Sequence, residues 1–202
     1  SIYSNDFDEN GQLDVVLTYQ QDGEQFPLRG RQCSAEQIPT LALKFKDYHS
    51  FATANLEEVY GEQNLKQAMH LKATTFASVL VENRGAQDWE MHPLPALAQL
   101  SNINDVLVKD LNRDGHLDLI VAGNLYRAEI ETPRNDAGIG LYLRGDGRCN
   151  FTPSPTTESG LYLPGDIKDL AEIRLQNGRR AILAGVNNGA VQIVGLPVKD
   201  EL

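Results

Sequence analysis

Apolar and polar residues in the second half of the chain follow the pattern of a strand meander. The two characters alternate over residues 103–109, and residues 117–122 are almost continuously apolar. Two short segments follow, at residues 139–143 and 150–152, separated by the turn-forming sequence Gly145-Asp146-Gly147. Because successive side chains of a strand point to opposite faces, these segments predict four antiparallel strands in chain order. A unit of about 50 residues has the size of one propeller blade.

The same unit recurs along the chain. Residues 6–17, DFDENGQLDVVL, match residues 110–121, DLNRDGHLDLIV, position for position. A third copy begins near residue 169, but a tight Asn177-Gly178 turn replaces its acidic loop, and Arg180 stands where Asp118 stands in the second copy. Asn-Gly is the preferred pair for a two-residue hairpin turn. The third copy is therefore predicted to be a blade without metal.

A helical pattern interrupts the first copy. Between residues 32 and 73 apolar residues recur at intervals of three or four, as in the group Leu56, Val59 and Tyr60 that precedes Gly61. Glycine at this place predicts the end of a helix, and the segment 34–37 has the sequence of a capping box. Strand pattern returns at residues 76–81. We expect one blade that carries a helical insertion of about 40 residues.

These units predict a mainly β protein of antiparallel, four-stranded propeller-type blades with a small helical insertion. We expect a blade with an acidic loop and the insertion over residues 1–95, a second blade with an acidic loop over 96–158, and a degenerate blade over 159–202. About three blades are too few to close a ring. An open ring leaves strand edges uncovered, so we expect other blades of the same longer chain, or an oligomeric mate, as partners.

The two acidic loops supply the oxygen ligands of a hard divalent cation. Ca²⁺ takes six to eight oxygens and tolerates irregular geometry, and a glycine at the sixth position lets the chain turn around the ion. We predict two Ca²⁺ sites. The side chains of the first loop are Asp6, Asp8, Asn10 and Asp14, with the carbonyl of Gln12; those of the second are Asp110, Asn112, Asp114 and Asp118, with the carbonyl of His116.

An EF-hand and a pair of Asx turns without an ion are the alternatives to these sites. An EF-hand loop needs a bidentate Glu at position twelve, where this chain has Leu17 and Val121, and its flanks are helical rather than β-branched. Solvated Asx turns without an ion explain one such loop more readily than two matched copies. The ion is expected to stabilise the fold rather than to perform chemistry.

Composition excludes several classes. Of the 202 residues 41% are hydrophobic and 23% charged, which suits a packed core, and no segment approaches the length of a membrane span. The net charge of −10 disfavours binding to nucleic acid. Cys33 and Cys149 are too few for a disulfide framework. No catalytic motif and no paired histidines with metal-ligand spacing occur in the sequence, so no catalytic residues are predicted.

The repeated Asp-x-Asx-x-Asx-Gly-x-x-Asp pattern, followed each time by an apolar strand, resembles the FG-GAP or VCBS-type calcium-binding repeats of integrin α-chain propellers and bacterial surface proteins. The helical insertion and residues 138–152 look most like the C-terminal part of bacterial proteins related to cartilage acidic protein. The resemblance implies calcium-stabilised propeller blades. The Phe-Gly-Gly-Ala-Pro signature of the repeat is absent, so integrin-like ligand recognition is not implied.

The function expected from this resemblance is that of an extracytoplasmic, calcium-stabilised binding or scaffold module with a protein or glycan ligand. The alternative is a part of a secreted polysaccharide-active enzyme of the lyase or hydrolase type. In that case the charged loop 127–136 would grip a sugar acid through Arg127, Glu129, Glu131, Arg134 and Asp136. A repeat with no ligand besides calcium is a third possibility. The terminal sequence Lys-Asp-Glu-Leu at 199–202 would indicate the endoplasmic-reticulum lumen only in a eukaryotic protein.

Overall fold

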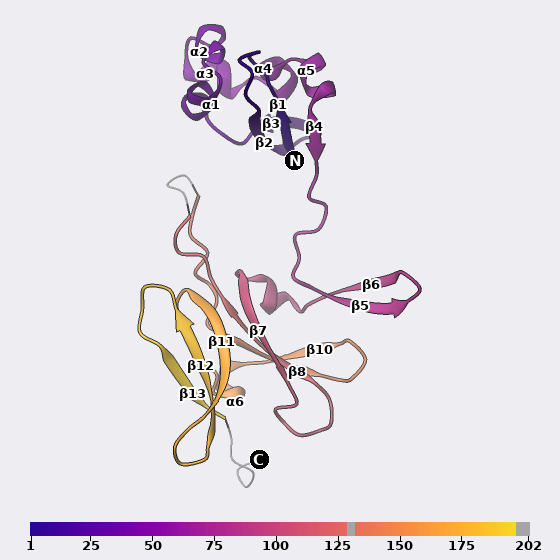
Figure 1. Cartoon of the computed structure of the whole chain (residues 1–202), viewed down its shortest axis with the longest axis vertical. Coiled ribbons are helices and arrows are strands. Elements are labelled where there is room, and N and C mark those ends of the chain that lie inside the picture. Colours follow the sequence, from indigo (N-terminus) through magenta and orange to yellow (C-terminus); the bar gives the residue numbers. More distant parts are fainter. Residues whose placement is uncertain (129–131, 197–202) are drawn as a thin grey trace. The chain divides into compact units, whose positions relative to one another are not determined.

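The computed structural model describes residues 1–128 and 132–196, and the chain divides into two compact units, residues 1–76 and 77–202. The architecture is mainly β, and all strand pairs are antiparallel within the described residues (Figure 1). In the same residues no helix has the length and apolar character needed to cross a membrane. The unit boundary at residue 76 differs from the boundary at residue 95 that the sequence suggested.

Unit 1 contains one four-stranded sheet with the order β3-β2-β1-β4. Its strands are β1 (Ile2–Asn5), β2 (Asp14–Gln21), β3 (Glu24–Pro27) and β4 (Met69–Leu71). The β2–β3 hairpin turns at Asp22 and Gly23, which have φ angles of 51° and 89°. Two positive φ angles are what a type I′ turn requires, and Asp-Gly is a preferred pair for it.

Five short helices connect β3 to β4 and cover the sheet of unit 1. They are α1 (Arg31–Gln37), α2 (Thr40–Lys44), α3 (Tyr48–Ala52), α4 (Leu56–Tyr60) and α5 (Glu62–Gln67). Their buried residues, which include Leu41, Phe51 and Val59, form one apolar cluster with Tyr3, Phe7 and Val16 of the sheet and first loop. Helix α4 ends at Gly61, with φ 83°, as the sequence predicts.

Three details of unit 1 correct the expectation from the sequence. Ser34 lies inside α1, so the predicted capping box is wrong; the capping box of this region is formed by Asn55 and Glu58 at α4. The helices end at Gln67, and residues 69–71 of the expected insertion form strand β4, which pairs with β1. Residues 76–81 therefore do not return to the first blade.

The segment that was expected to complete the first blade forms a separate two-stranded hairpin in unit 2. Its strands are β5 (Val79–Gly85) and β6 (Asp88–Pro93), and a short 3₁₀ helix, η1 (Ala96–Gln99), follows it. Gln99 holds this connection together, because its side chain bonds both the amide and the carbonyl of Ser78.

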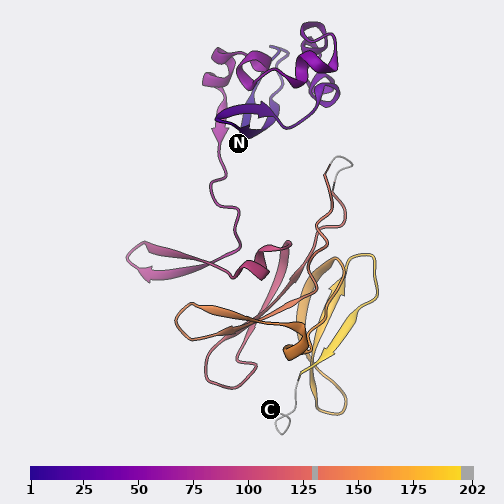
Figure 2. The ribbon, with the colours of Figure 1, turned by 180° about the vertical axis from the view of Figure 1, so that it is seen from behind.

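Unit 2 contains the predicted four-stranded meander, with the order β7-β8-β9-β10 (Figure 2). The strands are β7 (Ile103–Lys109), β8 (Asp118–Gly123), β9 (Leu141–Gly145) and β10 (Phe151–Ser154). Every residue of β8 is buried, which explains why its sequence is continuously apolar after Asp118. The short helix α6 (Thr156–Ser159) follows the meander.

A second, three-stranded sheet of unit 2 corresponds to the predicted third copy. It consists of β11 (Ile167–Arg174), β12 (Arg180–Val186) and β13 (Gln192–Gly195). The β11–β12 connection is not the expected two-residue turn. The Gly178 amide donates to the Leu175 carbonyl, and Gly178 has a φ of 81° while Asn177 keeps a negative φ. This is the geometry of a type I turn followed by a glycine bulge.

The two sheets of unit 2 pack on a shared core. Ile120 and Ala122 of β8 join Ile167, Ile182 and Ala184 of the second sheet in one buried cluster. Polar side chains of β7 connect it to β11, the first strand of the second sheet. Asp105 accepts from the Leu170 amide at 2.6 Å, and Asn104 donates to the Ile167 carbonyl at 2.7 Å. Lys109 pairs with Glu172. Glu172 also lies 3.3 Å from the Nε atom of Arg180.

The Lys109–Glu172 pair gives the junction a pH dependence. The hydrogen bond from Lys109 is the main cause that holds the pKa of Glu172 below its ordinary value of 4.5, and the charge of Arg180 acts in the same direction. A lowered pKa means that the stabilisation is complete above pH 4.5 and disappears as the pH falls through the folded-state pKa.

We expect Glu172→Gln to lower the free energy of unfolding by about 1 kcal/mol at pH 7, because a charge-assisted pair is replaced by a neutral amide. The difference from wild type shrinks toward zero in acid, and urea unfolding at several pH values measures it. Glu158→Gln is the control, since it removes a negative charge of the same unit beside the Ser154 hydroxyl. Equal losses in the two variants would contradict the assignment.

Candidate metal centres

The first acidic loop connects β1 to β2 and is held by its own side chains. Asp6 accepts hydrogen bonds from the backbone amides of Asn10 and Gly11 at 2.9 and 2.8 Å, and Asn10 accepts from the Gln12 amide at 2.8 Å. Asp14, the first residue of β2, accepts from the Phe7 amide at 3.0 Å. The loop is thus wound around its carboxylates rather than extended into solvent.

The second loop connects β7 to β8 and repeats this arrangement. Asp110 accepts from the Gly115 amide at 3.1 Å, Asp114 from the His116 amide at 2.8 Å, and Asp118 from the Leu111 amide at 2.9 Å. Asn112 contributes differently, because its amide group donates to Asp114 at 2.8 Å and its oxygen accepts from the Asp114 amide.

The backbone of the two loops also matches. Glu9 and Arg113, at the fourth position of each loop, have φ angles of 60° and 65°, and Gly11 and Gly115 have 86° and 90°. Positive φ costs energy for a residue with a side chain, so the same conformation at non-glycine positions in both loops indicates a common constraint. The matched sequences therefore fold to matched structures.

Each loop leaves one buried carboxylate oxygen without a hydrogen-bond donor. These atoms are Oδ1 of Asp8 in the first loop and Oδ1 of Asp110 in the second. A buried carboxylate oxygen is normally satisfied, and an orphan of this kind fits a cation. In the first loop Asp6, Asp8 and Asp14 each bring an oxygen within 4.8 Å of the other two. The donor set is all oxygen, which suits Ca²⁺.

Asp14 and Asp118 are both buried, but their surroundings differ. Burial is the main cause that raises the pKa of Asp14 above its ordinary value, and the charges of Asp8 and Asp6 add to it against the hydrogen bond from Phe7. The carboxylate of the first loop is thus costly to ionise without a cation. In the second loop the hydrogen bond from the His116 amide instead lowers the pKa of Asp114.

Asp118 is already satisfied by the protein. It is 0% exposed and accepts from the Leu111 amide, from the Tyr142 hydroxyl at 2.9 Å and from the Gly145 amide at 3.0 Å. Burial and the adjacent Asp118 raise the pKa of Tyr142, so its hydroxyl stays a donor. Within the described residues the three carboxylates of the second loop do not form a cluster as close as that of the first. Asp118 has a structural role that the sequence did not indicate.

Sequence reasoning also missed a cluster in unit 2. Glu82 of β5, His92 of β6 and Cys149 of the β9–β10 turn each place one ligand atom within 4.8 Å of the others. The Nε2 atom of His92 lies 3.0 Å from Oε2 of Glu82. A motif with fixed residue spacing cannot identify this group, because its members lie on two strands and in a distant turn. Only the pairing of β5 with β6 would have placed two of them on one face.

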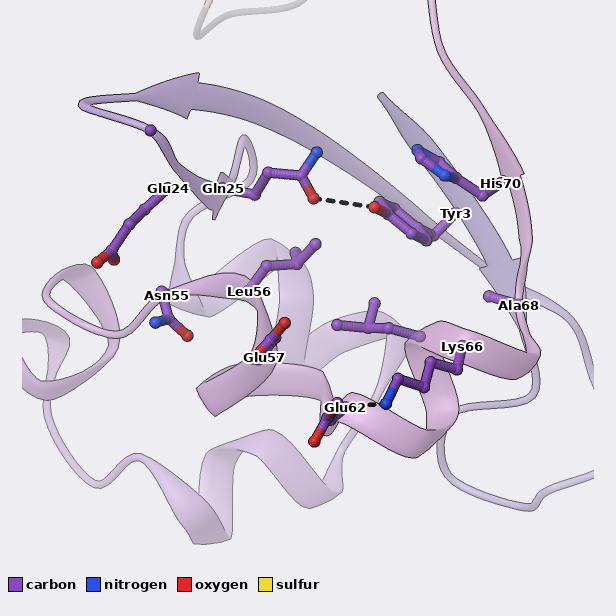
Figure 3. A pocket seen from close by; sticks show the side chains of 12 residues that line it. Tyr3, Glu24, Gln25, Asn55, Leu56, Glu57, Glu62, Lys66, Ala68 and His70 are labelled. Carbon is purple, nitrogen blue, oxygen red and sulfur yellow. Dashed lines mark hydrogen bonds and ion pairs between the residues drawn. The ribbon is translucent and has the colours of Figure 1, made fainter.

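The largest described cleft of unit 1 lies between the β1–β3 region and helices α4 and α5, with a volume of about 620 Å³ (Figure 3). The rings of Tyr3 and His70 stack at one side, 4.1 Å apart, and the Tyr3 hydroxyl donates to Gln25. Lys66 pairs with Glu62 on α5. Because Tyr3 is buried and covered by His70, it offers no open ring face for a sugar.

The charged loop that carried the enzymatic alternative is in part internally paired. Arg134 donates to Asp136 at 2.9 Å and lies 4.5 Å above the ring of Tyr126. Glu129 and Glu131 lie outside the described residues, as does the terminal sequence 199–202. Among the described residues of this loop, Arg134 is thus paired with Asp136, whereas Arg127 is exposed.

No protein family, curated protein or solved structure matches this chain in the comparisons with known proteins.

The contrast between Asp14 and Asp118 predicts opposite responses to the same substitution. In the presence of a chelator Asp14→Asn leaves the melting temperature unchanged or raises it, because it removes repulsion with Asp6 and Asp8. Asp118→Asn lowers stability by about 2 kcal/mol with or without calcium, since an amide cannot accept all the donors that face this carboxylate. Thermal unfolding followed by circular dichroism measures both; equal losses in chelator would contradict the distinction.

Proposed function

We propose that this chain is a calcium-stabilised segment of an extracytoplasmic β-propeller that acts as a binding or scaffold module without catalysis. The observation that carries the proposal is the matched pair of acidic loops. In both, the first aspartate accepts from the amide of the loop glycine and the last aspartate accepts from the amide of the second residue. Both also have positive φ angles at the fourth and sixth positions and one orphaned carboxylate oxygen, and both lead directly into a strand.

The proposed ions are Ca²⁺, one in each loop. The ligands are the side chains of Asp6, Asp8, Asn10 and Asp14 with the Gln12 carbonyl, and those of Asp110, Asn112, Asp114 and Asp118 with the His116 carbonyl. Burial, with the charges of Asp8 and Asp6 in addition, raises the pKa of Asp14, so its ionised carboxylate requires compensation. Ca²⁺ would supply that compensation and link the start of each loop to its end.

The propeller assignment rests on unit 2. In a propeller the sheets lie around an axis, with the first strand of each blade nearest to it. Here the first strands of the two sheets, β7 and β11, are neighbours connected by Asp105, Asn104 and the Lys109–Glu172 pair. Unit 1 departs from this pattern, because β4 occupies the edge of β1 that a blade would leave free.

An extracytoplasmic location follows from the chemistry of the proposed sites. Oxygen sites of modest affinity are filled at the millimolar calcium concentrations outside cells but not at cytosolic concentrations. Two bound ions would also change the formal net charge of −10 by four, which reduces repulsion within the folded chain.

Calcium is expected to raise the melting temperature of the protein after it has been stripped with EDTA, because an ion that binds only the folded state stabilises it by mass action. The rise is lost in the Asp14→Ala, Asp118→Ala double variant. Magnesium at the same concentration serves as the ionic control, since it demands a more regular octahedral site. A wild-type melting curve that is identical with EDTA and with calcium would refute the proposal.

The proposed partners are further blades or a second copy of the chain. Val106 and Val108 of β7 are 40% and 53% exposed, which leaves part of the first strand of the meander uncovered. Burial of such side chains against another sheet is favourable. Gel filtration with light scattering is expected to show self-association of the isolated chain; a stable monomer at high concentration would remove the need for a partner.

A further inference from the structure

The Glu82, His92 and Cys149 cluster of unit 2 lies outside the acidic loops and has a different chemistry. It combines a carboxylate, an imidazole and a thiol, whereas the loops offer only oxygen. Its ligand atoms all lie within 4.8 Å of one another, and the Nε2 atom of His92 is 3.0 Å from Oε2 of Glu82. Ligand atoms on one tetrahedral zinc ion are about 3–4 Å apart, given bond lengths of about 2.0 Å to nitrogen and 2.3 Å to sulfur. The cluster needs little contraction to reach that geometry.

The elements around the cluster hold its members in place. In the β5–β6 hairpin Leu80 pairs with His92 and Glu82 with Glu90, so Glu82 and His92 lie diagonally on one face. Cys149 sits in the β9–β10 turn, where Asp146 accepts from the backbone amides of Arg148 and Asn150 at 2.7 and 3.2 Å. The turn is therefore shaped by its own hydrogen bonds, and strand pairing sets the register of the hairpin.

The cluster lies where a bound ion would connect the β5–β6 hairpin to the meander of unit 2. A two-stranded hairpin alone is marginally stable in water, and Val81, Trp89 and Met91 of β5–β6 are each about half exposed or more. Leu80 of the hairpin and Cys149 of the turn line the same cleft beside the meander. An ion held by Glu82, His92 and Cys149 would tie the hairpin to the β9–β10 turn.

The local charges balance a divalent ion. Glu82, Glu90 and a Cys149 thiolate carry three negative charges, and Arg84, which pairs with both glutamates, carries one positive charge. A neutral His92 adds none. The remaining two negative charges equal the charge of Zn²⁺, and binding releases the thiol proton to solvent. His92 is 25% and Glu82 34% exposed at the side chain, so an ion can enter from solvent.

We propose that Glu82, His92 and Cys149 form a zinc site, with one carboxylate oxygen, one imidazole nitrogen and one thiolate as ligands and water at the fourth position. Thiolate and imidazole together select Zn²⁺ over Ca²⁺, because Ca²⁺ prefers oxygen alone. The proposed ligands differ from those of the calcium loops, and Gly115 and His116 of the second loop line the same cleft as Cys149. The proposal does not rest on the function proposed for those loops.

Cobalt serves as the probe, because Co²⁺ occupies zinc sites and its bond to a thiolate produces a charge-transfer absorption band. The EDTA-stripped full chain, titrated with Co²⁺ in the presence of excess Ca²⁺, is expected to develop this band with one equivalent, and Zn²⁺ is expected to displace the cobalt. Cys149→Ser abolishes the band, and His92→Ala and Glu82→Gln each weaken binding by at least about tenfold.

Cys33→Ser and His49→Ala are the matched controls, since both residues lie in unit 1. They are expected to leave the band and the affinity unchanged, and circular dichroism verifies that each variant is folded. Asp14→Asn keeps the band, which separates this site from the calcium site of the first loop. The proposal is overturned if folded wild type shows no thiolate band, if Cys33→Ser removes the band, or if Ca²⁺ competes with Co²⁺ for it.

Discussion

The structure of both loops depends on burying the last aspartate. Asp14 and Asp118 begin the strands that follow the loops, are 4% and 0% exposed, and accept a hydrogen bond from the second residue of the same loop. A buried carboxylate must be compensated by donors or by a cation. The protein uses both solutions to different degrees: Asp118 is surrounded by donors from β9 and its loop, whereas Asp14 faces Asp6 and Asp8. The same sequence pattern therefore gives one loop that is largely complete and one that is electrostatically strained.

The strands and the acidic loops could be predicted from the sequence because their signals are local. The strand at residues 103–109 and the apolar run of β8 each lie within one segment and were confirmed. The pairing of β4 with β1 could not be predicted in this way. All three residues of β4 are exposed, so no alternation marks the strand, and its partner lies at the other end of the unit.

Tertiary contacts also decide the side-chain roles that the sequence missed. Tyr142 lies on β9, and its hydroxyl donates to Asp118, a contact that its position in the sequence does not indicate. Ser34 and Gln37 have the spacing of a capping box, yet the N-cap of α1 is Gly30, and Ser34 already lies inside the helix. In both cases the role of the side chain depends on its neighbours in space, which the sequence does not give.

Arg180, at the start of β12, gives the third copy a fixed positive charge where the other two copies are proposed to bind a metal ion. Arg180 occupies the position at which the other copies have a buried aspartate, and it lies against Glu172, which also binds Lys109. The positive charge at this place is thus part of the polypeptide and is present as soon as the chain folds. An ion can be lost by dilution or to a competing chelator, but a guanidinium cannot. The third copy has in effect an internal counter-ion, and its stability should be indifferent to the mineral content of the medium.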